Sequence, residues 1–246
     1  MKVVGVIPAR WGATRFEGKI LAPIAGKPMI QHVWERSRQS QKLDDVLIAC
    51  DDERILSAAK EFGAQAILTS QEHSSGTDRI IEVIQDLKVD VVINIQGDEP
   101  LIHHSVIDAL ATAMSDDPSV VMATVIKGVE KEEELSDSNV VKVVIDRDQN
   151  ALYFSRCLIP YNRSRNQQLY YKHIGIYAYQ KDFLCAFKKL PKRYLEEAER
   201  LEQLRVLESG CKIKTIVTDR EMISVDTPED VNRVEIFLNH QGTQNG

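Results

Sequence analysis

Short apolar runs alternate with segments of helical periodicity over the first half of the chain. The runs are bounded by turn-forming residues, which is typical of strands buried in a parallel sheet. We expect such strands at 3–7, 46–49, 66–68, 91–95 and 120–126. The segments between them have one apolar face and predict helices at 28–37, 53–62, 78–87 and 105–114. This alternation predicts an α/β fold, with a doubly wound, mostly parallel sheet and helices on both faces.

Two of the expected helices carry residues that mark their ends. Gly63 follows the second helix and is expected to be its C-cap, because glycine adopts the left-handed conformation without steric cost. Thr77 or Asp78 is expected to cap the N-terminus of the third helix, since either side chain can accept a hydrogen bond from the first turn.

The pattern changes in the second half of the chain. Apolar runs at 140–146 and 151–155, joined by a short polar turn, predict a β-hairpin. The other elements expected in this half are a strand at 173–179, one amphipathic helix at 194–208, strands at 213–217 and 223–225, and a helix beginning at Pro228.

No internal repeat or interdomain linker interrupts the sequence. We therefore expect a single domain over 1–246, in which the region from about 140 to 180 is an insertion or a dimerisation arm. The residues after His240 are rich in Gln and Gly, and we expect a frayed tail at 241–246.

Composition narrows the class of protein. With 246 residues, 43% of them hydrophobic, the chain can bury the core of one large α/β domain. The formal net charge of −6 argues against non-specific nucleic-acid binding, which requires a broad basic surface. No apolar run reaches ~18 residues and the N-terminus lacks the pattern of a signal peptide, so neither a membrane span nor secretion is expected. The cysteines and histidines show no metal-ligand spacing, and we expect a cytoplasmic protein.

Positive charge is concentrated in the loop that follows the first expected strand. Arg10, Arg15 and Lys19 lie there, together with Gly12 and Gly18. Open α/β sheets bind their ligands at the carboxyl ends of the strands, and glycines allow backbone amides to approach an anion closely. The loop is therefore either a polyphosphate-binding loop or an ordinary solvated basic loop.

The spacing of this loop argues against two common phosphate-binding motifs. A Walker-type loop has four residues between its glycines, whereas here five residues separate Gly12 from Gly18. The Walker lysine is followed by Ser or Thr at the start of a helix, but Lys19 is followed by Ile20 and then by Pro23. The glycines also lack the spacing of the dinucleotide fingerprint, which argues against NAD.

Two aspartates, Asp98 and Asp226, each follow an expected strand. Next to a polyphosphate, carboxylates in this position are suitable ligands for Mg²⁺. Asp98 follows a glycine, and an ordinary turn residue is the alternative interpretation. Beside Asp226, Thr227 and Asp230 have the spacing of a capping box, a role that is compatible with a metal ligand at 226.

Two further groups of polar residues are candidates for ligand binding. The segment 73–79 enters the third expected helix and can bind an anion or a base, although an ordinary helix cap is equally consistent. In the second half, Arg156 suits bidentate binding of a carboxylate, and Glu202 and Gln203 can bind sugar hydroxyls. Taken singly, these residues and His173 are also typical of surface, capping or structural groups.

Taken together, the motifs resemble those of the 3-deoxy-manno-octulosonate cytidylyltransferase family. The matching strings follow the family's order from Ile7 to Asp230 and include NIQGDEP, MAT, ALYFSR, KHIGIYAY, LEQLR and VDTPED. Members of this family transfer CMP from CTP to 3-deoxy-D-manno-octulosonate (Kdo), release pyrophosphate and use Mg²⁺. The resemblance implies a nucleotide-diphospho-sugar transferase fold and a cytoplasmic homodimer that acts in lipopolysaccharide synthesis.

The resemblance also implies a role for each matching residue. It implies catalytic roles for Arg10, Lys19 and Asp98, and Mg²⁺ binding by Asp98 and Asp226. It implies nucleotide binding by Arg10, Arg15, Lys19, Ser75, Gly76, Thr77 and Arg79. It implies sugar binding by Gln96, Arg156, His173, Tyr177, Glu202 and Gln203.

The chain departs from the family pattern in the first loop. Glu17 and Ile20 stand where the family commonly has prolines, and the loss of two φ restraints is expected to loosen the loop. Glu17 also adds an anion between Arg15 and Lys19, which is expected to weaken CTP binding. Two alternatives to Kdo activation stay open at this point. One is activation of a related acidic sugar, such as 8-amino-Kdo or sialic acid, and the other is a non-catalytic nucleotide-binding protein.

Overall fold

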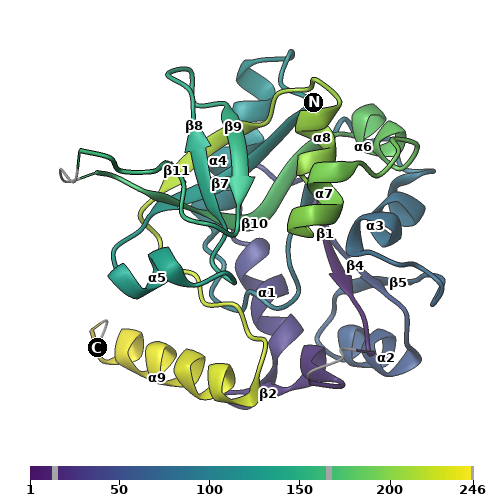
Figure 1. Cartoon of the computed structure of the whole chain (residues 1–246). Coiled ribbons are helices and arrows are strands. Elements are labelled where there is room, and N and C mark those ends of the chain that lie inside the picture. The colour runs from purple at the N-terminus through teal and green to yellow at the C-terminus, as the bar shows by residue number, and fades with distance from the viewer. Residues whose placement is uncertain (13–15, 165–167, 245–246) are drawn as a thin grey trace. The chain divides into compact units, whose positions relative to one another are not determined.

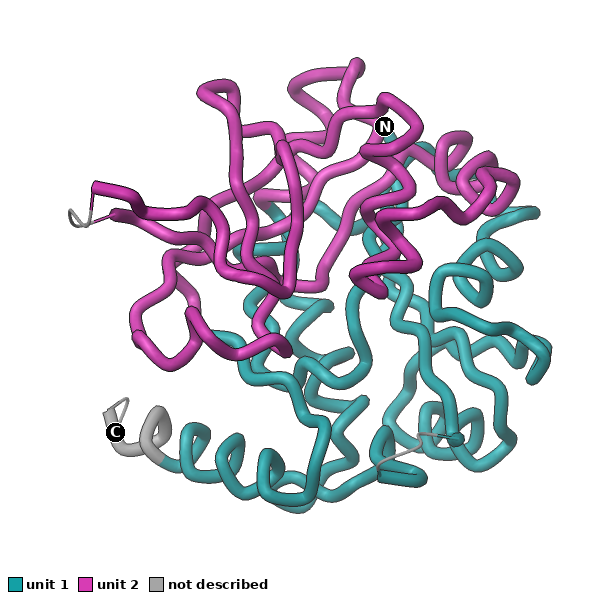
Figure 2. Tube along the Cα trace, viewed as in Figure 1, with its two compact units in different colours: residues 1–108, 221–246 teal, residues 109–220 magenta. Residues whose placement is uncertain are grey.

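The computed structural model describes residues 1–12, 16–164 and 168–244, of which the last five are described through their backbone (Figure 1). The chain forms two compact units (Figure 2). Unit 1 contains residues 1–108 and 221–246, and unit 2 contains residues 109–220. The expectation of a single domain over 1–246 stays a prediction.

Parallel strands form the centre of unit 1. β1 (Val3–Ala9) pairs with β4 (Asp45–Cys50) on one side and with β6 (Val91–Asn94) on the other, and β4 pairs with β5 (Gln65–Leu68). All three pairings are parallel. Nearly all side chains of β1, β4 and β6 are buried, which explains why these strands read as continuous apolar runs.

The order of these strands, β6-β1-β4-β5, shows that the chain winds in two directions from β1. It moves outward through β4 to β5 and then returns to β6 on the opposite side of β1. With right-handed crossovers, such a reversal places helices on both faces of the sheet. The α/β fold with a mostly parallel sheet is thereby confirmed, and the point of reversal lies between β1 and β6.

The helices of unit 1 follow the expected alternation. They are α1 (Met29–Ser37), α2 (Glu53–Glu61), α3 (Gly76–Ile84) and α9 (Pro228–Gln244), with a short 3₁₀ helix η1 (Lys19–Leu21) and a two-stranded sheet of β2 (Pro23–Ile24) and β3 (Lys27–Pro28). α4 (His104–Asp116) begins in unit 1 and ends in unit 2. The backbone of α9 continues to Gln244, beyond the point at which we expected the tail to fray, and residues 245–246 lie outside the described range.

One of the two expected helix ends is confirmed and the other is wrong. Gly63 follows α2 with a φ of +82°, as expected of a glycine that ends a helix. The third helix begins earlier than the apolar periodicity indicated, and its N-cap is Ser75 rather than Thr77 or Asp78. Ser75 Oγ accepts a hydrogen bond from the backbone N–H of Asp78 at 3.1 Å.

Unit 2 is built around a mixed group of strands. β7 (Met122–Gly128) pairs in parallel with β11 (Lys214–Thr218) and antiparallel with β10 (Tyr171–Gln180). β8 (Lys142–Ile145) and β9 (Ala151–Ser155) form the expected antiparallel hairpin, and β8 also pairs with β10. The helices of this unit are α5 (Glu132–Ser136), α6 (Lys181–Phe187), α7 (Tyr194–Glu199) and α8 (Leu204–Glu208).

Two expected elements in the second half of the chain are wrong. The segment 194–208 is not one helix, because Arg200 adopts a left-handed conformation with a φ of +54° and separates α7 from α8. Glu202 and Gln203 lie in this break. The run 223–225 forms no strand, and its backbone is instead tied to the end of β6 by a hydrogen bond from Val225 N–H to Asp98 O at 2.9 Å.

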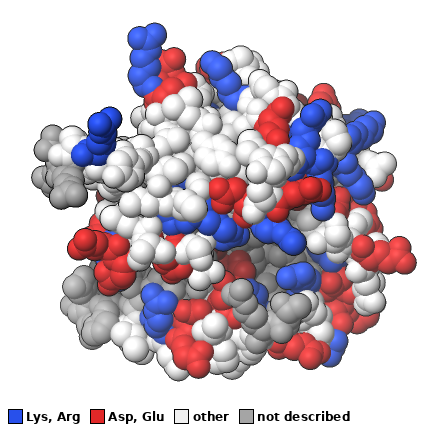
Figure 3. Space-filling view, viewed as in Figure 1, with Lys and Arg blue, Asp and Glu red and all other residues white. Residues whose placement is uncertain are grey.

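Two observations describe the distribution of charge on one face and the apolar character of the helices. On the face drawn in Figure 3, acidic and basic side chains are interspersed and leave no broad basic area. Within the part of the chain that the structure describes, no helix is long and apolar enough to cross a membrane.

Candidate active site

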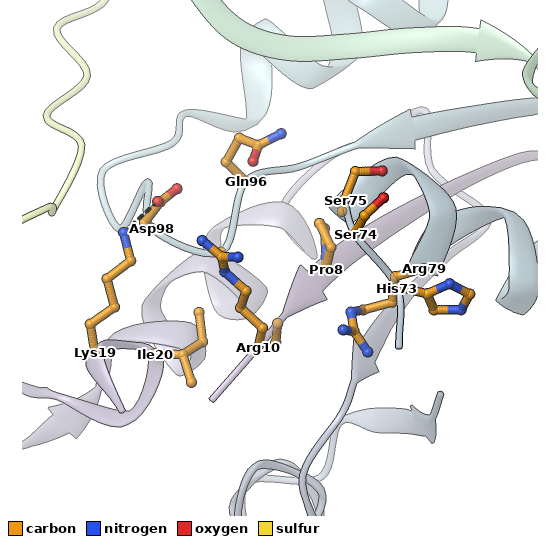
Figure 4. Close-up of a pocket in the computed structure, with 13 residues that line it drawn as sticks. Pro8, Arg10, Lys19, Ile20, His73, Ser74, Ser75, Arg79, Gln96 and Asp98 are labelled. Atoms are coloured by element: carbon orange, nitrogen blue, oxygen red, sulfur yellow. Dashed lines mark hydrogen bonds and ion pairs between the residues drawn. The ribbon is translucent and has the colours of Figure 1, made fainter. Parts of the chain in front are cut away.

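The candidate site lies in unit 1, at the carboxyl ends of β1 and β6. The chain reverses its winding between these two strands, and this is where doubly wound sheets bind their ligands. A pocket at this place is lined by residues from four segments, namely the end of β1, the start of η1, the start of α3 with the residues before it, and the loop after β6 (Figure 4). Its lining includes seven residues that we expected at the site: Arg10, Lys19, Ser75, Gly76, Arg79, Gln96 and Asp98.

Gly97 allows the loop after β6 to pack against the end of β1. A Cβ atom at this position would lie 2.6 Å from Ile20 Cδ1 and 3.0 Å from the carbonyl oxygen of Pro8. Both distances are shorter than a normal contact, and the carbonyl belongs to a buried strand that cannot easily move. The absence of a side chain at residue 97 therefore brings Asp98 and Gln96 close to the first loop.

Lys19 joins the two aspartates that we expected to bind metal. Its ammonium donates to Asp98 Oδ2 at 2.8 Å, to Asp226 Oδ1 at 3.1 Å and to the carbonyl oxygen of Val225 at 2.9 Å. Burial acts to lower the pKa of Lys19, but the carboxylates of Asp98 and Asp226 outweigh it and raise the pKa above its ordinary value. Lys19 is therefore a cation at neutral pH. Figure 4 shows Arg10 and Lys19 extending toward the loop that carries Gln96 and Asp98.

The pair of carboxylates fits one kind of magnesium site. Among the described residues, no cluster of three or more His, Cys, Asp or Glu side chains could enclose a metal by itself. Mg²⁺ at a nucleotide is commonly held by one or two carboxylates, with water and substrate phosphates as the other ligands. Asp98 and Asp226 already converge on one cation, the Lys19 ammonium, so their arrangement suits this open type of site.

Glu99 is a buried member of the site that sequence reasoning missed. Ser224 Oγ donates to Glu99 Oε1, whereas Glu99 Oε2 is buried without a hydrogen-bond partner in the described structure. Burial raises the pKa of Glu99 to about 8, with a further contribution from the charges of Asp98 and Asp226 and an opposing one from the Ser224 hydrogen bond. Its place inside the NIQGDEP string, directly after Asp98, was the available signal.

Trp11 holds the loop after β1 through contacts at both its backbone and its ring. Its backbone N–H donates to Asp51 Oδ1 at 2.9 Å, and its carbonyl oxygen accepts from Gly18 N–H at 3.0 Å. The indole N–H donates to Glu17 Oε1 at 3.0 Å, and the guanidinium of Arg54 lies 3.5 Å from the ring centroid. Glu17 is thus a partner of Trp11, which sequence reasoning did not anticipate. Arg15, the residue that Glu17 was expected to oppose, lies outside the described residues.

The start of α3 supplies the second wall of the pocket. Ser75 and Gly76 line it, while Thr77 is buried in the first turn of the helix and is not among the lining residues. Arg79 lines the pocket but its guanidinium is already bonded, to Asp51 Oδ2 at 3.0 Å, to the carbonyl of Ser70 at 3.2 Å and to Thr69 Oγ1. Arg79 and Trp11 share Asp51 as a partner, so the two loops are connected.

Unit 2 holds the other expected sugar-binding residues, beginning with Arg156. The Nε of Arg156 donates to the carbonyl of Glu199 at 2.7 Å, and Nη1 donates to the carbonyl of Ser138 at 2.9 Å. The carboxylate of Glu199 accepts from the Arg156 backbone N–H and from Ser155 Oγ. The guanidinium is oriented by neutral carbonyl groups, so its charge is left for an anionic ligand.

His173 and Tyr177 lie in a row of aromatic rings on β10 and β9. The ring centroid of His173 is 5.0 Å from that of Phe154, edge to face, and 5.4 Å from that of Tyr177. Tyr177 is in turn 5.8 Å from Tyr179. Burial raises the pKa of Tyr177, and the charge of Glu202 raises it further.

Gln203 is buried and has an unsatisfied donor. Its exposed fraction is 4%, and its side-chain nitrogen has no hydrogen-bond partner in the described structure. Because a buried polar atom without a partner is costly, this nitrogen is a candidate for bonding a ligand. Glu202 and Gln203 lie between α7 and α8, where the chain breaks after Arg200.

Comparison with known proteins gives one consistent family. A model of the cytidylyltransferase family matches residues 4–216. The chain is similar to a 3-deoxy-manno-octulosonate cytidylyltransferase of Solibacter usitatus, with 49% identity over 249 residues that cover 100% of this chain and 99% of that protein. It is also 48% identical to a protein of the same name from Desulfatibacillum aliphaticivorans, over 98% of this chain and 100% of that protein.

Solved structures give the same result. A CMP:2-keto-3-deoxy-manno-octonic acid synthetase complexed with CTP superposes with a TM-score of 0.94 at 42% identity, covering 98% of this chain and 100% of that one. A 4-diphosphocytidyl-2C-methyl-D-erythritol synthase from Anaerococcus prevotii superposes with a TM-score of 0.65 at 13% identity, over 97% of this chain and 98% of that one. The second likeness shows a shared fold alone.

Proposed function

The chain belongs to the 3-deoxy-manno-octulosonate cytidylyltransferase family, and from this premise we propose that it transfers CMP from CTP to Kdo with release of pyrophosphate. One observation of the structure supports this proposed activity in addition to the family membership. Lys19, Asp98 and Asp226 converge at the point of the sheet where a nucleotide is expected, beside a pocket that also contains Arg10 and the N-terminus of α3.

In this proposal, the main task of the site is to stabilise the negative charge that accumulates on the leaving pyrophosphate. The anomeric hydroxyl of the sugar attacks the α-phosphorus of CTP, the bond to pyrophosphate breaks in line, and the hydroxyl proton is released to solvent. Arg10 and Lys19 stabilise the negative charge that accumulates on the leaving pyrophosphate, with Arg15 as a further nucleotide ligand. Mg²⁺, held by Asp98 and Asp226, supplies additional positive charge when bound. The start of α3, from Ser75 to Arg79, binds the cytidine portion.

We propose that the acidic sugar binds the polar groups described in unit 2. The guanidinium of Arg156, which only carbonyl oxygens and no carboxylate engage in the described structure, is suited to the sugar carboxylate. The buried amide of Gln203, with Glu202, His173 and Tyr177, is suited to the sugar hydroxyls. A related acidic sugar, such as 8-amino-Kdo or sialic acid, is the alternative substrate.

We also propose that the protein is a cytoplasmic homodimer that acts in lipopolysaccharide synthesis. Large apolar side chains are exposed along the region 140–180, which supports its role as the dimerisation arm. They are Leu152 at 60%, Leu158 at 44%, Tyr161 at 86% and Leu169 at 62% exposed. Sedimentation of the purified protein tests the proposed dimer. Leu152→Glu should convert the dimer to a monomer, and a monomeric wild-type protein would contradict the proposed dimer.

The test of the activity is pyrophosphate release from CTP and Mg²⁺, with Kdo, 8-amino-Kdo, sialic acid or no sugar. We expect release that depends on Kdo and is abolished by EDTA and by Asp98→Asn. Asp219→Asn is the matched control, since the Asp219 side chain is 98% exposed and is not among the residues that line the pocket. If pyrophosphate is released only with another sugar, that sugar replaces Kdo as the proposed substrate, while the proposed transfer of CMP is retained. Binding of CTP without release for any sugar would support the non-catalytic alternative.

A further inference from the structure

Thr124 lies opposite an irregularity in β10, next to the expected sugar-binding residues. Along β7 and β10, Thr124 is paired with Tyr177 and Val125 with Ile174, so two residues of β10 have no partner in the register. This is a β-bulge, a feature that re-aims side chains and is common beside functional sites. Thr124 itself is completely buried, and it belongs to the MAT string, to which the proposed function assigns no role.

The hydroxyl of Thr124 has three polar neighbours, all of them in β10. Its Oγ1 lies 2.9 Å from the carbonyl oxygen of Ile176, 3.4 Å from that of Ile174 and 3.0 Å from His173 Nε2. A hydroxyl has one proton to donate, and a carbonyl oxygen can only accept. The short contact with Ile176 therefore takes the proton of Thr124.

This assignment determines the direction of the contact with His173. With its own proton committed to the bulge, Thr124 Oγ1 can only accept, so the proton between the two groups must belong to His173 Nε2. The opposite arrangement would leave the Thr124 and Ile176 oxygens facing each other at 2.9 Å without a proton between them. Such a buried pair of acceptors is unfavourable.

The same geometry determines the protonation state of Nδ1, the other nitrogen of the ring. Burial lowers the pKa of His173 to about 3, so the imidazole is neutral at neutral pH and carries one proton. With that proton on Nε2, Nδ1 has a free lone pair, and no described residue bonds to it. Phe154 and Tyr177 lie on either side of the ring and restrict its rotation.

We propose that Thr124 is a positioning residue that holds His173 in the Nε2–H tautomer, so that Nδ1 accepts a hydrogen bond from a hydroxyl of the sugar. The identity of the ligand in this inference rests on the proposed function, whereas the tautomer of His173 does not depend on it. A sugar hydroxyl is selected because it is a donor, while a group that can only accept would be repelled by the lone pair of Nδ1. The tautomer thereby contributes to the recognition of a polyhydroxylated substrate.

Long-range ¹H–¹⁵N NMR of histidine-labelled protein at neutral pH tests the tautomer, since protonated and bare ring nitrogens have well-separated ¹⁵N shifts. The signals of His173 are assigned by their absence in His173→Gln. We expect a protonated Nε2 and a bare Nδ1 in the wild-type protein and in Thr124→Ser, which keeps the hydroxyl. A protonated Nδ1 in the wild-type protein would overturn the proposal. This measurement on the wild-type protein does not require any Thr124 variant to fold.

Thr124→Val removes the acceptor for Nε2–H while nearly keeping the shape of the side chain. We expect it to show a mixture of the two tautomers and to raise the KM for the sugar about five-fold, with an unchanged KM for CTP. An unchanged spectrum would overturn the role of Thr124. A changed spectrum with an unchanged KM for the sugar would overturn the role of Nδ1 as an acceptor. Because wild-type turnover is measured separately, failure of the proposed function is distinguished from failure of this inference.

Discussion

Trp11 shows how one residue can hold the loop after β1, which we propose binds phosphate and in which Glu17 and Ile20 stand where the resemblance led us to expect prolines. Its indole N–H holds Glu17, its backbone is held by Asp51, and the guanidinium of Arg54 stacks on its ring. The charge of Glu17 is therefore engaged inside the loop rather than directed freely at a nucleotide. We conclude that contacts with a tryptophan partly replace the φ restraint that proline provides elsewhere.

This arrangement predicts different effects for two substitutions in the loop. Glu17→Gln keeps an oxygen that can accept from the Trp11 indole, so we expect the KM for CTP to change less than about two-fold. Trp11→Phe keeps the ring but removes the donor, and we expect the KM for CTP to rise about three- to five-fold. Steady-state pyrophosphate release measures both values. A large gain in CTP affinity for Glu17→Gln would instead support simple repulsion by its charge.

The sequence predicted which residues lie together at the candidate site better than it predicted the partners of each side chain. Lys19, Asp98 and Asp226 were expected at one site, because each follows a strand or lies in the first loop. The partners of Arg79, by contrast, are Asp51, Ser70 and Thr69, and no local pattern relates these residues to it. Partners of this kind depend on how the loops pack, which a pattern of apolar and polar residues does not encode.

At the scale of elements, the packing of β6 against β1 sets the geometry of the site. The loop after β6 approaches Pro8 and Ile20 so closely that a side chain at residue 97 would force these neighbours to shift. The expected strands and helices between residues 3 and 95 were confirmed, because their apolar runs and periodicities are long enough to be unambiguous. The short run 223–225, which also belongs to unit 1, was wrong. The helix at 194–208 was wrong since its leucines follow helical spacing, whereas the backbone turns at Arg200.

Gly97→Ala is predicted to damage both stability and binding. The new methyl group would meet Ile20 and the carbonyl of Pro8, and relieving these contacts would move the loop that carries Asp98. We expect a loss of about 1–3 kcal/mol in the free energy of unfolding and weaker CTP binding. Denaturant unfolding and a CTP titration measure these effects. Gly128→Ala is the control, since the nearest atom to its Cβ would be Leu169 Cδ1 at 3.6 Å. Equal stability of the two variants would contradict the prediction.

At the scale of the whole molecule, two buried groups with opposite shifts should shape the dependence of stability on pH. His173 has a folded-state pKa of about 3, below its ordinary value, so its contribution is present above about pH 6.5 and is lost as the pH falls toward 3. Glu99 has a folded-state pKa of about 8, above its ordinary value of 4.5. Its contribution is present below pH 4.5 and is lost as the pH rises toward 8.

Unfolding by urea over this pH range, in EDTA, tests both groups. Each group should contribute a slope of about 1.4 kcal/mol per pH unit between its two pKa values, positive for His173 and negative for Glu99. The two slopes oppose each other between about pH 4.5 and 6.5. We therefore expect Glu99→Gln to flatten the decline in stability above pH 6.5, and His173→Gln to flatten the decline below pH 4.5. Parallel curves for the wild-type protein and either variant would refute the assignment for that group.

The discontinuity of unit 1 has a consequence for synthesis on the ribosome. Arg10, Lys19 and Asp98 are translated early, whereas Asp226 and the strand-end contact of Val225 are translated only after the whole of unit 2. A nascent chain that has reached residue 220 therefore presents Lys19 with one of its two carboxylate partners. The proposed pair of metal-binding aspartates is therefore completed only near the end of synthesis, and a polypeptide that stops before residue 226 lacks the second of them.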